Sequence, residues 1–275
     1  MLKRILSDLA SSGRALIGLR NQIEPCPVCQ KSATYLGAVD FNKSCMEGAE
    51  TNFHPSGQSI AYYLCRHCGY SFAPEFMRWS EAQFKERIYN EDYQLVDPDY
   101  ESVRPSDNAA LIKKTFGAAK DEIKHLDYGG GSGLLSQLLA DDGWSSTTYD
   151  PFVDDHFPFV KTNQKFDLIT AFEVMEHVPQ PRQLLERLVS LCKPNGLVFF
   201  STLIFDSGAL ERFSLDWWYV APRNGHVSIF SDKSLKVLFA QYGMNVAHVD
   251  QNLHVAYRAI PDWANALNFF HMSAR

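Results

Sequence analysis

The stretch that decides the fold is HLDYGGGSG, residues 125–133, which carries four glycines within five positions. Apolar residues around it, among them Ile123 and Leu126, predict a short strand before the glycines. LLSQLLA, residues 134–140, has the apolar spacing of a helix. A strand, a glycine turn and a helix form the opening unit of a doubly wound nucleotide-binding sheet. Glycines suit such a turn because the backbone there adopts unusual φ/ψ values and approaches a ligand closely.

The spacing of these glycines distinguishes between two kinds of ligand. A dinucleotide fingerprint Gly-x-Gly-x-x-Gly/Ala that begins at Gly129 would need a small residue where the chain has Leu134. The acid and glycines of this stretch instead alternate in the pattern Asp-x-Gly-x-Gly-x-Gly. That pattern resembles the first motif of class I S-adenosylmethionine (SAM) dependent methyltransferases, although an unrelated glycine turn is the alternative. The resemblance implies that the methionine part of SAM faces Asp127, Gly129, Gly130, Gly131 and Gly133.

A second acidic residue follows at a suitable distance. SSTTY, residues 145–149, predicts a strand after the Asp142-Gly143 turn, and Asp150 comes directly after it. An acid about 20 residues beyond the glycine turn suits hydrogen bonding to ribose hydroxyls. Asp150 is therefore a predicted SAM contact.

Composition limits the class of protein. The chain has 275 residues, a formal net charge of -6 and 45% hydrophobic residues, which fits one α/β domain with a small module. The acidic balance makes a nucleic-acid partner unlikely, because phosphate binding favours a basic surface. No apolar run reaches the length of about 18 residues that a membrane span needs. The sequence does not indicate an oligomeric state.

Four of the six cysteines form two close pairs, Cys26 with Cys29 and Cys65 with Cys68. Each pair has the C-x-x-C spacing of a zinc knuckle, and two knuckles complete a closed tetrahedral site, which is structural rather than catalytic. Cys45 lies between the pairs as a substitute ligand, as does His54, and redox-active or free thiols are the alternatives. This use of cysteine predicts a reducing compartment, and we expect a cytoplasmic protein.

The chain divides into four predicted segments. Residues 1–22 have helical apolar spacing with basic residues, so we expect an amphipathic helix that packs on its own protein or touches a membrane surface or a partner. A zinc ribbon at 23–75 follows, then a helical linker or lid at 76–104, and then a SAM domain at 105–275. A zinc ribbon before a SAM domain resembles bacterial methyltransferases that act on sugars and other small molecules.

A second motif follows the predicted strand FDLITAF, residues 166–172. EVMEH, residues 173–177, comes directly after it and resembles the E-x-x-E-H form of the fourth motif of the SAM family. The carboxyl end of a buried strand faces the ligands in such a sheet. Phe172 and Glu173 are therefore predicted to contact the cofactor.

Three roles are open for the polar residues of this motif. Glu176 and His177 would position the loop by hydrogen bonds, or His177 would act as a general base. Resemblance to metal-binding small-RNA and ubiquinone-pathway O-methyltransferases implies a third role, a divalent cation such as Mg²⁺ at Glu173, Glu176 and His177 with His226 as a further ligand. His226 lies in GHVSIFS, residues 225–231, a string that recurs at the pocket edge in the family.

The segment after Asp150 is short for a complete helix-strand-helix unit, and FPFV, residues 157–160, predicts a minimal third strand. An alcohol or carbon acid must lose a proton before or during methyl transfer, and the candidate bases are His177, His226 and Tyr93. An aromatic stretch around Trp217 and Tyr219 would bind the acceptor or pack as core.

Together these features predict an α/β protein with a seven-stranded, doubly wound, mostly parallel Rossmann-like sheet and a small zinc ribbon. The predicted activity is SAM-dependent O- or C-methylation of a small-molecule or sugar acceptor in a biosynthetic pathway. Two alternatives are open: an RNA or protein methyltransferase that uses the ribbon for recognition, and a SAM-binding or zinc-ribbon adaptor without activity.

Overall fold

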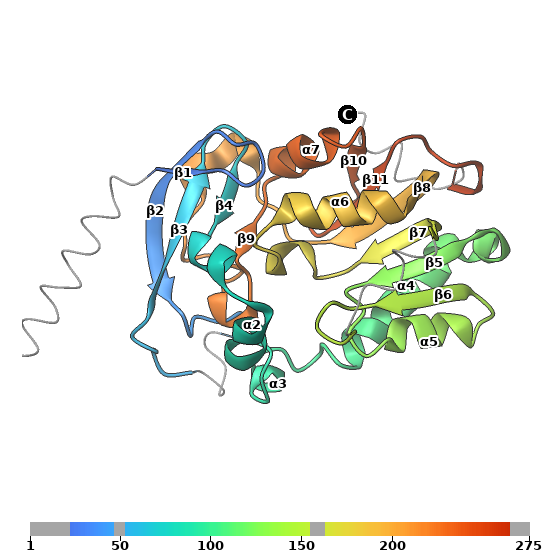
Figure 1. Ribbon diagram of the computed structural model, residues 1–275, viewed down its shortest axis with the longest axis horizontal. Helices are drawn as coiled ribbons and strands as arrows, with labels where there is room; N and C mark the ends of the chain where they lie inside the picture. The colour runs from blue at the N-terminus through green and yellow to red at the C-terminus, as the bar shows by residue number, and fades with distance from the viewer. Residues whose placement is uncertain (1–22, 47–52, 155–162, 265–275) are drawn as a thin grey trace, which may run out of the picture.

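The computed structural model describes residues 23–46, 53–154 and 163–264, and two sheets form its framework (Figure 1). A five-stranded sheet has the order β1-β2-β3-β4-β9, and a six-stranded sheet has the order β10-β11-β8-β7-β5-β6. The helix expected over residues 1–22 and the strand expected over residues 157–160 lie outside the described residues.

The larger sheet confirms the predicted doubly wound arrangement. Its parallel strands are β5 (Lys124–Tyr128), β6 (Ser145–Tyr149), β7 (Phe166–Ala171) and β8 (Cys192–Ser201). An antiparallel hairpin of β10 (Asn245–His248) and β11 (Leu253–Tyr257) extends it beside β8. Six of the seven expected strands lie within the described residues. The remaining one, the third strand expected at 157–160, lies outside them.

Helices cover both faces of the larger sheet. Figure 1 shows α4 (Val103–Phe116) and α5 (Leu134–Ala140) on one side, with α6 (Pro181–Leu191) and α7 (Asp232–Ala240) on the other. Ser231 caps α7 through a capping box with Ser234. The apolar stripe of α6 packs into one core and that of α5 into another.

A strand from the C-terminal part of the chain completes the smaller sheet at one edge. It comprises β1 (Ile23–Pro25), β2 (Ser32–Asp40), β3 (Ser59–Cys65), β4 (Tyr70–Phe72) and β9 (Ser228–Ile229). β9 pairs antiparallel with β4, so residues more than 150 positions apart share one sheet. The buried core around Tyr70 continues directly into Phe230 and α7. The division into domains at 75 and 104 stays a prediction.

The segment between the two sheets carries short helices: η1 (Pro74–Arg78), α2 (Glu81–Arg87) and α3 (Tyr93–Val96). Ser80 caps α2 with a capping box to Gln83. Aromatic side chains from this segment pack with Tyr219 and Val220 in a third core. The segment thereby holds its tyrosines over the carboxyl ends of the parallel strands. The remaining helices of the described residues are short 3₁₀ helices: η2 (Gly117–Glu122), η4 (Met175–His177), η5 (Ser207–Arg212), η6 (Pro222–Asn224) and η7 (Asp262–Ala264).

The Asn195-Gly196 pair has the composition of a turn, but it lies inside β8. The partner of Phe166 is Cys192 and the partner of Leu168 is Leu197. Between these two pairs β8 has more residues than β7, and β8 accommodates them in a bulge-like irregularity. In the three described ranges, no helix combines the length and the hydropathy that crossing a membrane requires.

Candidate active site

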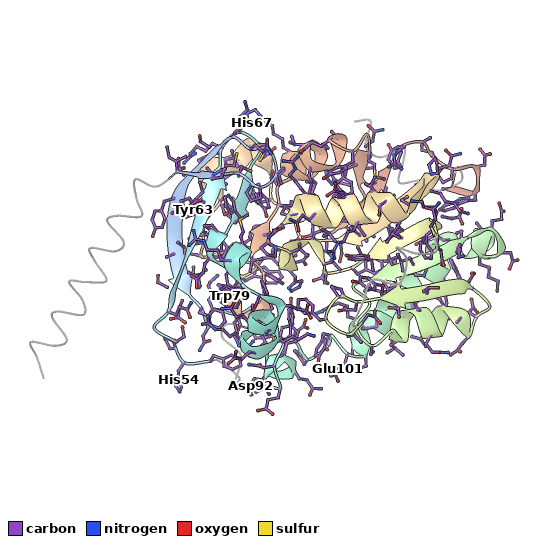
Figure 2. The ribbon with its side chains drawn as sticks, viewed as in Figure 1. His54, Tyr63, His67, Trp79, Asp92 and Glu101 are labelled. Atoms are coloured by element: carbon purple, nitrogen blue, oxygen red, sulfur yellow. The ribbon has the colours of Figure 1, made fainter. Side chains whose placement is uncertain are left out.

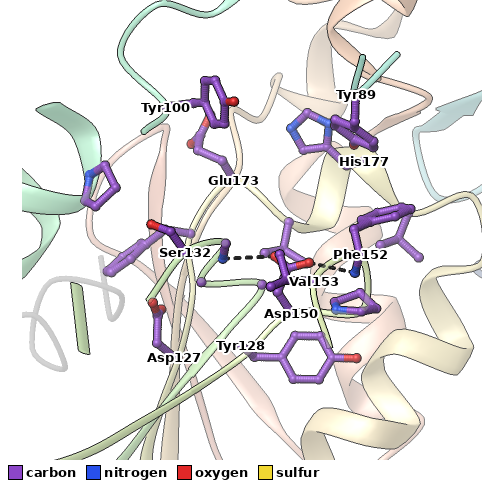
Figure 3. A pocket seen from close by; sticks show the side chains of 18 of the residues that line it. Tyr89, Tyr100, Asp127, Tyr128, Ser132, Asp150, Phe152, Val153, Glu173 and His177 are labelled. Carbon is purple, nitrogen blue, oxygen red and sulfur yellow. Dashed lines mark hydrogen bonds between the residues drawn. The ribbon is translucent and has the colours of Figure 1, made fainter. Parts of the chain in front are cut away.

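A cavity of about 1070 Å³ opens at the carboxyl ends of β5, β6 and β7 (Figure 3). We call one end of it the glycine half, formed by residues 127–132 and Asp150. We call the other end the aromatic half, and its lining side chains are Phe84, Tyr89, Tyr93, Asp97, Tyr100, Arg104, Phe152 and His177. Phe172 and Glu173, directly after β7, lie on the cavity wall as well.

The glycine turn has the backbone geometry that its sequence predicted. Gly129, Gly131 and Gly133 have φ values of 78°, 54° and 85°, in the left-handed region that side chains disfavour. A Cβ on Gly130 would overlap the Asp127 carboxylate and the Thr148 hydroxyl. A Cβ on Gly131 would meet nothing within 4 Å, because this side of the turn faces the open cavity.

Asp150 is fixed against the same turn. Its Oδ2 accepts a hydrogen bond from the Gly131 amide at 3.0 Å, and its Oδ1 accepts one from the Phe152 amide at 2.8 Å (Figure 3). The carboxylate is thus held on the cavity wall by two backbone donors. This position is compatible with hydrogen bonding to hydroxyl groups of a ligand in the glycine half.

Asp127 lies deeper, under the turn, and is only 3% exposed. Its Oδ1 accepts a hydrogen bond from Thr170 Oγ1 at 2.8 Å, and His125 Nε2 lies 2.9 Å from the same hydroxyl. Burial, and then the charge of Asp150, raise the pKa of Asp127 to about 7, against the opposing effect of the Thr170 hydrogen bond. Burial also lowers the pKa of His125 to about 3, so this imidazole is neutral.

Glu173 adopts a strained backbone conformation at the end of β7. Its φ of 53° is unusual for a residue with a side chain. Ser201 on β8 holds it in place, since the Ser201 hydroxyl accepts from the Glu173 amide at 2.8 Å and donates to Glu173 Oε1 at 2.7 Å. Such strain persists where surrounding contacts fix it, and it is common at ligand sites.

The structure brings Glu176, His177 and His226 together, and we call these three residues the Glu–His cluster. One ligand-type atom of each lies within 4.8 Å of those of the other two. Tyr219 supports two members: its hydroxyl donates to Glu176 Oε1 at 2.5 Å, and its carbonyl lies 2.9 Å from His226 Nδ1. Glu173 is not part of this cluster.

Two buried atoms of the Glu–His cluster have no hydrogen-bond partner among the described residues: Glu176 Oε2 and His177 Nδ1. A Cβ on Gly225 would lie 2.9 Å from His177 Nδ1, so the absent side chain leaves room beside that atom. Burial raises the pKa of Glu176 well above its ordinary value, and the charge of Glu173 adds to the effect. Burial lowers the pKa of His177 well below its ordinary value.

The three predicted bases occupy different positions. His177 lines the cavity beside Tyr89. Tyr93 also lines it, but its hydroxyl donates to the Asn224 carbonyl at 3.3 Å and burial raises its pKa well above the ordinary value. His226 is buried behind His177, with ring centroids 5.0 Å apart, and is not among the lining residues.

The four knuckle cysteines converge, as their spacing predicted. Cys26 and Cys68 have sulfur atoms 3.7 Å apart, and those of Cys29 and Cys65 are 3.5 Å apart. A tetrahedral zinc ion with Zn–S bonds of about 2.3 Å separates its sulfurs by roughly 3.8 Å, so the arrangement suits zinc. All four sulfurs lie within 4.8 Å of one another.

The substitute ligands considered for this cysteine site were wrong. Cys45 lies instead beside the Glu–His cluster, with its sulfur 3.8 Å from His226 Nδ1. His54 lies at the opposite end of the small sheet from His67, which sits inside the second knuckle (Figure 2). Neither belongs to the group of four sulfurs.

Sequence reasoning missed several residues that shape the cavity. Arg104 forms a bidentate ion pair with Asp97 at 2.7 and 2.8 Å, and both line the aromatic half. Tyr100 was not singled out, although tyrosines recur through a largely polar segment there. Ser201 and Thr170 looked like ordinary strand residues. Only the pairing of β7 with its neighbours shows that they hold Glu173 and Asp127.

Comparison with known proteins gives a consistent family. The methyltransferase-domain family matches residues 100–249. A ubiquinone biosynthesis O-methyltransferase of Coxiella burnetii is 36% identical over 102 residues, covering 29% of this chain and 44% of the relative. The protein of that name from Salmonella paratyphi A is 32% identical over 104 residues, covering 29% and 42%. The chain thus spans less than half the length of the curated relatives it matches.

Solved structures are more distant. An O-methyltransferase family protein from Burkholderia thailandensis has a TM-score of 0.42 and 13% identity, covering 68% of this chain and 70% of that one. This likeness is too low to bear on the activity.

Proposed function

The chain belongs to the family of methyltransferase domains, and we propose that it transfers a methyl group from SAM to an oxygen of a small-molecule acceptor. The observation that carries the proposal is the cavity at the carboxyl ends of β5, β6 and β7, which joins the glycine turn and Asp150 to the E-x-x-E-H loop. The family match covers these same elements. The curated relatives support oxygen as the methylated atom, since they are named O-methyltransferases.

The glycine half would hold SAM. Gly131 offers open space where a side chain would otherwise stand, and Asp150 presents a carboxylate for the ribose hydroxyls. Asp127 would face the methionine part, with the Phe172 ring on the adjoining wall. When bound, SAM supplies a methyl group already activated by its sulfonium, so the protein's main contribution is alignment.

His177 is the base that the geometry favours. It lines the cavity, and its lowered pKa keeps it neutral at pH 7, where it is able to accept a proton. The Tyr93 hydroxyl stays protonated and serves as a donor. His226 supports His177 from behind.

Asp150→Ala tests the SAM site. Calorimetric titration with S-adenosylhomocysteine should show affinity reduced by about 1–3 kcal/mol, the cost of an unpaired buried contact. Asp142→Ala is the matched control, because Asp142 is exposed in the turn before β6 and does not line the cavity. Equal affinities of the two variants would contradict the ribose assignment.

The cysteine site would bind one structural zinc ion. Four thiolates leave no open coordination position, so this ion would stabilise the fold of the small sheet rather than take part in methyl transfer. Metal analysis of the purified protein should give one zinc per chain at this site. Cys65→Ser should lower the zinc content and the unfolding temperature, and unchanged zinc content would contradict the assignment.

The Glu–His cluster is a candidate for a second ion, and the two unpartnered atoms are the observation that favours it. Two imidazoles and one carboxylate suit a transition ion such as Zn²⁺ or Mn²⁺ better than Mg²⁺, which prefers oxygen ligands. The hydrogen bond that the Tyr219 hydroxyl donates to Glu176, and the one that the Tyr219 carbonyl accepts from His226 Nδ1, would orient these ligands. Glu176→Gln should then remove one equivalent of bound transition metal and leave the cysteine-bound zinc. If the wild type and Glu176→Gln both bind a single equivalent of metal, the Glu–His cluster holds no ion, and His177 acts as an unliganded base.

A further inference from the structure

We infer that the acceptor is an uncharged aromatic ring compound, and not a sugar linked to a nucleoside diphosphate. The inference rests on the proposed function, since it concerns the acceptor of that reaction. Three features of the aromatic half carry it: the arrangement of its rings, the pairing of its hydrogen-bond donors and the balance of its charges.

The rings form a continuous apolar wall. Tyr93 has its ring centroid 5.1 Å from those of both Tyr89 and Tyr100, and Phe152 lies 4.9 Å from Tyr89. All four rings line the cavity. Rings at such separations present faces and edges that favour stacked or edge-to-face contact with another planar ring.

The wall leads toward the predicted base. Tyr89 and His177 lie side by side, with ring centroids 6.2 Å apart (Figure 3). A planar acceptor seated against Tyr89 and Tyr93 would therefore have an edge close to the imidazole. A hydroxyl on that edge would be placed for proton removal and methyl transfer.

Three hydrogen-bond donors beside the rings are engaged within the protein. The Tyr93 hydroxyl donates to the Asn224 carbonyl at 3.3 Å, and the Tyr100 hydroxyl donates to Glu101 at 2.8 Å. Arg104 is held by both oxygens of Asp97. A sugar ring needs several polar partners to replace its hydration, and recruiting these groups would break existing bonds.

The charges of the aromatic half disfavour phosphate. The cavity lining includes three cations, Lys85, Arg104 and Arg187. Arg104 is paired with Asp97, and Lys85 is paired with Glu81 at 2.8 Å. Arg187 lies at the glycine end, where it interacts with the Tyr128 hydroxyl.

The carboxylates on the aromatic side outnumber the cations there. Glu101 and Glu173 both line the cavity, and each accepts its hydrogen bond from a neutral hydroxyl rather than from a cation. Arg104 interacts with Glu173 as well as with Asp97. Asp97, Glu101 and Glu173 thus outnumber the one cation beside them, and this excess of negative charge would repel a diphosphate group. A neutral ring meets no such repulsion.

The test compares two classes of probe on the protein saturated with S-adenosylhomocysteine. Catechol, resorcinol and 2-naphthol are the aromatic probes, and UDP-glucose is the nucleotide-linked sugar, all titrated by calorimetry. We expect the best aromatic probe to bind at least tenfold more tightly than UDP-glucose. Tyr100→Ala should weaken its binding several-fold, while Tyr35→Ala, a half-exposed tyrosine on β2 away from the cavity, should leave it unchanged.

The outcomes separate this inference from the proposed function. Failure of the folded protein to bind S-adenosylhomocysteine would overturn the proposed function and the inference with it. Binding of S-adenosylhomocysteine without binding of any aromatic probe, or tighter binding of UDP-glucose, would overturn the inference alone. Equal effects of the two tyrosine variants would also contradict it, since the ring wall would then play no part.

Discussion

The two halves of the cavity are built in different ways. The glycine half consists mainly of backbone and two carboxylates, supplied by the end of β5, the turn after it and the residue after β6. The aromatic half consists of side chains from the α2–α4 segment, from the loop after β7 and, at Phe152, from the loop after β6, with further support from Tyr219 and Gly225. Backbone geometry suits a ligand that is common to many enzymes, whereas side chains gathered from distant segments suit an acceptor particular to one enzyme. Changes in one half should therefore affect cofactor affinity, and changes in the other should affect turnover.

The largest expected effect is that of a substitution at His177, which should lower turnover and leave cofactor affinity nearly unchanged. His177→Gln should lower the rate of methyl transfer to catechol from labelled SAM roughly 10²–10⁴-fold, the typical contribution of a general base. The affinity for S-adenosylhomocysteine should stay within a factor of about two, because the side chain lies in the aromatic half. His54→Gln, at an exposed site away from the cavity, should change neither quantity.

A pH experiment tests the buried acid of the glycine half. The folded-state pKa of Asp127 is about 7, above its ordinary value of 3.8, so between these values the folded protein binds more protons than the unfolded chain. The contribution of Asp127 to stability is thus present at low pH and is lost as the pH rises toward 7. The unfolding free energy of the wild type minus that of Asp127→Asn should fall by about 1 kcal/mol per pH unit across this range. Urea unfolding of both proteins from pH 5 to 7 measures it, and a flat or rising difference would count against a buried, destabilised carboxylate.

Gly130→Ala should affect the glycine half alone. The added Cβ would overlap Asp127 and Thr148, so the turn must shift, at a cost of about 1–3 kcal/mol in affinity for S-adenosylhomocysteine. Gly117→Ala is the matched control, since a Cβ there meets nothing within 4 Å and its φ is helical. Equal calorimetric affinities for the two variants would show that the turn does not hold the cofactor.

The smallest effect concerns the hydroxyl of Tyr93. Tyr93→Phe leaves the Asn224 carbonyl without its donor and should cost about 0.5–1.5 kcal/mol of stability. Tyr242→Phe removes a comparable bond to the Arg182 carbonyl outside the cavity and should cost about as much. Only the Tyr93 variant should change the KM for catechol, so a similar change in both would remove Tyr93 from the acceptor site.

The parts of the molecule that the sequence predicted correctly are those that local patterns determine. The helix at 134–140 and the glycine turn each depend on residues only a few positions apart. The two cysteine pairs were also predictable, because C-x-x-C spacing already specifies the turn of each knuckle.

The remaining features depend on tertiary contacts that leave no local signal. Tyr219 reaches Glu176 across 43 positions, and β9 joins β4 only because the chain returns to the small sheet. Asn195-Gly196 has the composition of a turn, yet the sheet accommodates it as an irregularity within β8. The aromatic half could not be assembled from the sequence for the same reason, since its rings come from separate short helices and loops.

The most direct test of the central claim is a crystal structure of the protein with bound S-adenosylhomocysteine. Our account predicts that Asp150 accepts hydrogen bonds from the ribose hydroxyls and that the sulfur faces Glu173 and His177 at the border of the two halves. S-adenosylhomocysteine bound elsewhere, or with Asp150 still engaged only by the Gly131 and Phe152 amides, would contradict the assignment of the glycine half.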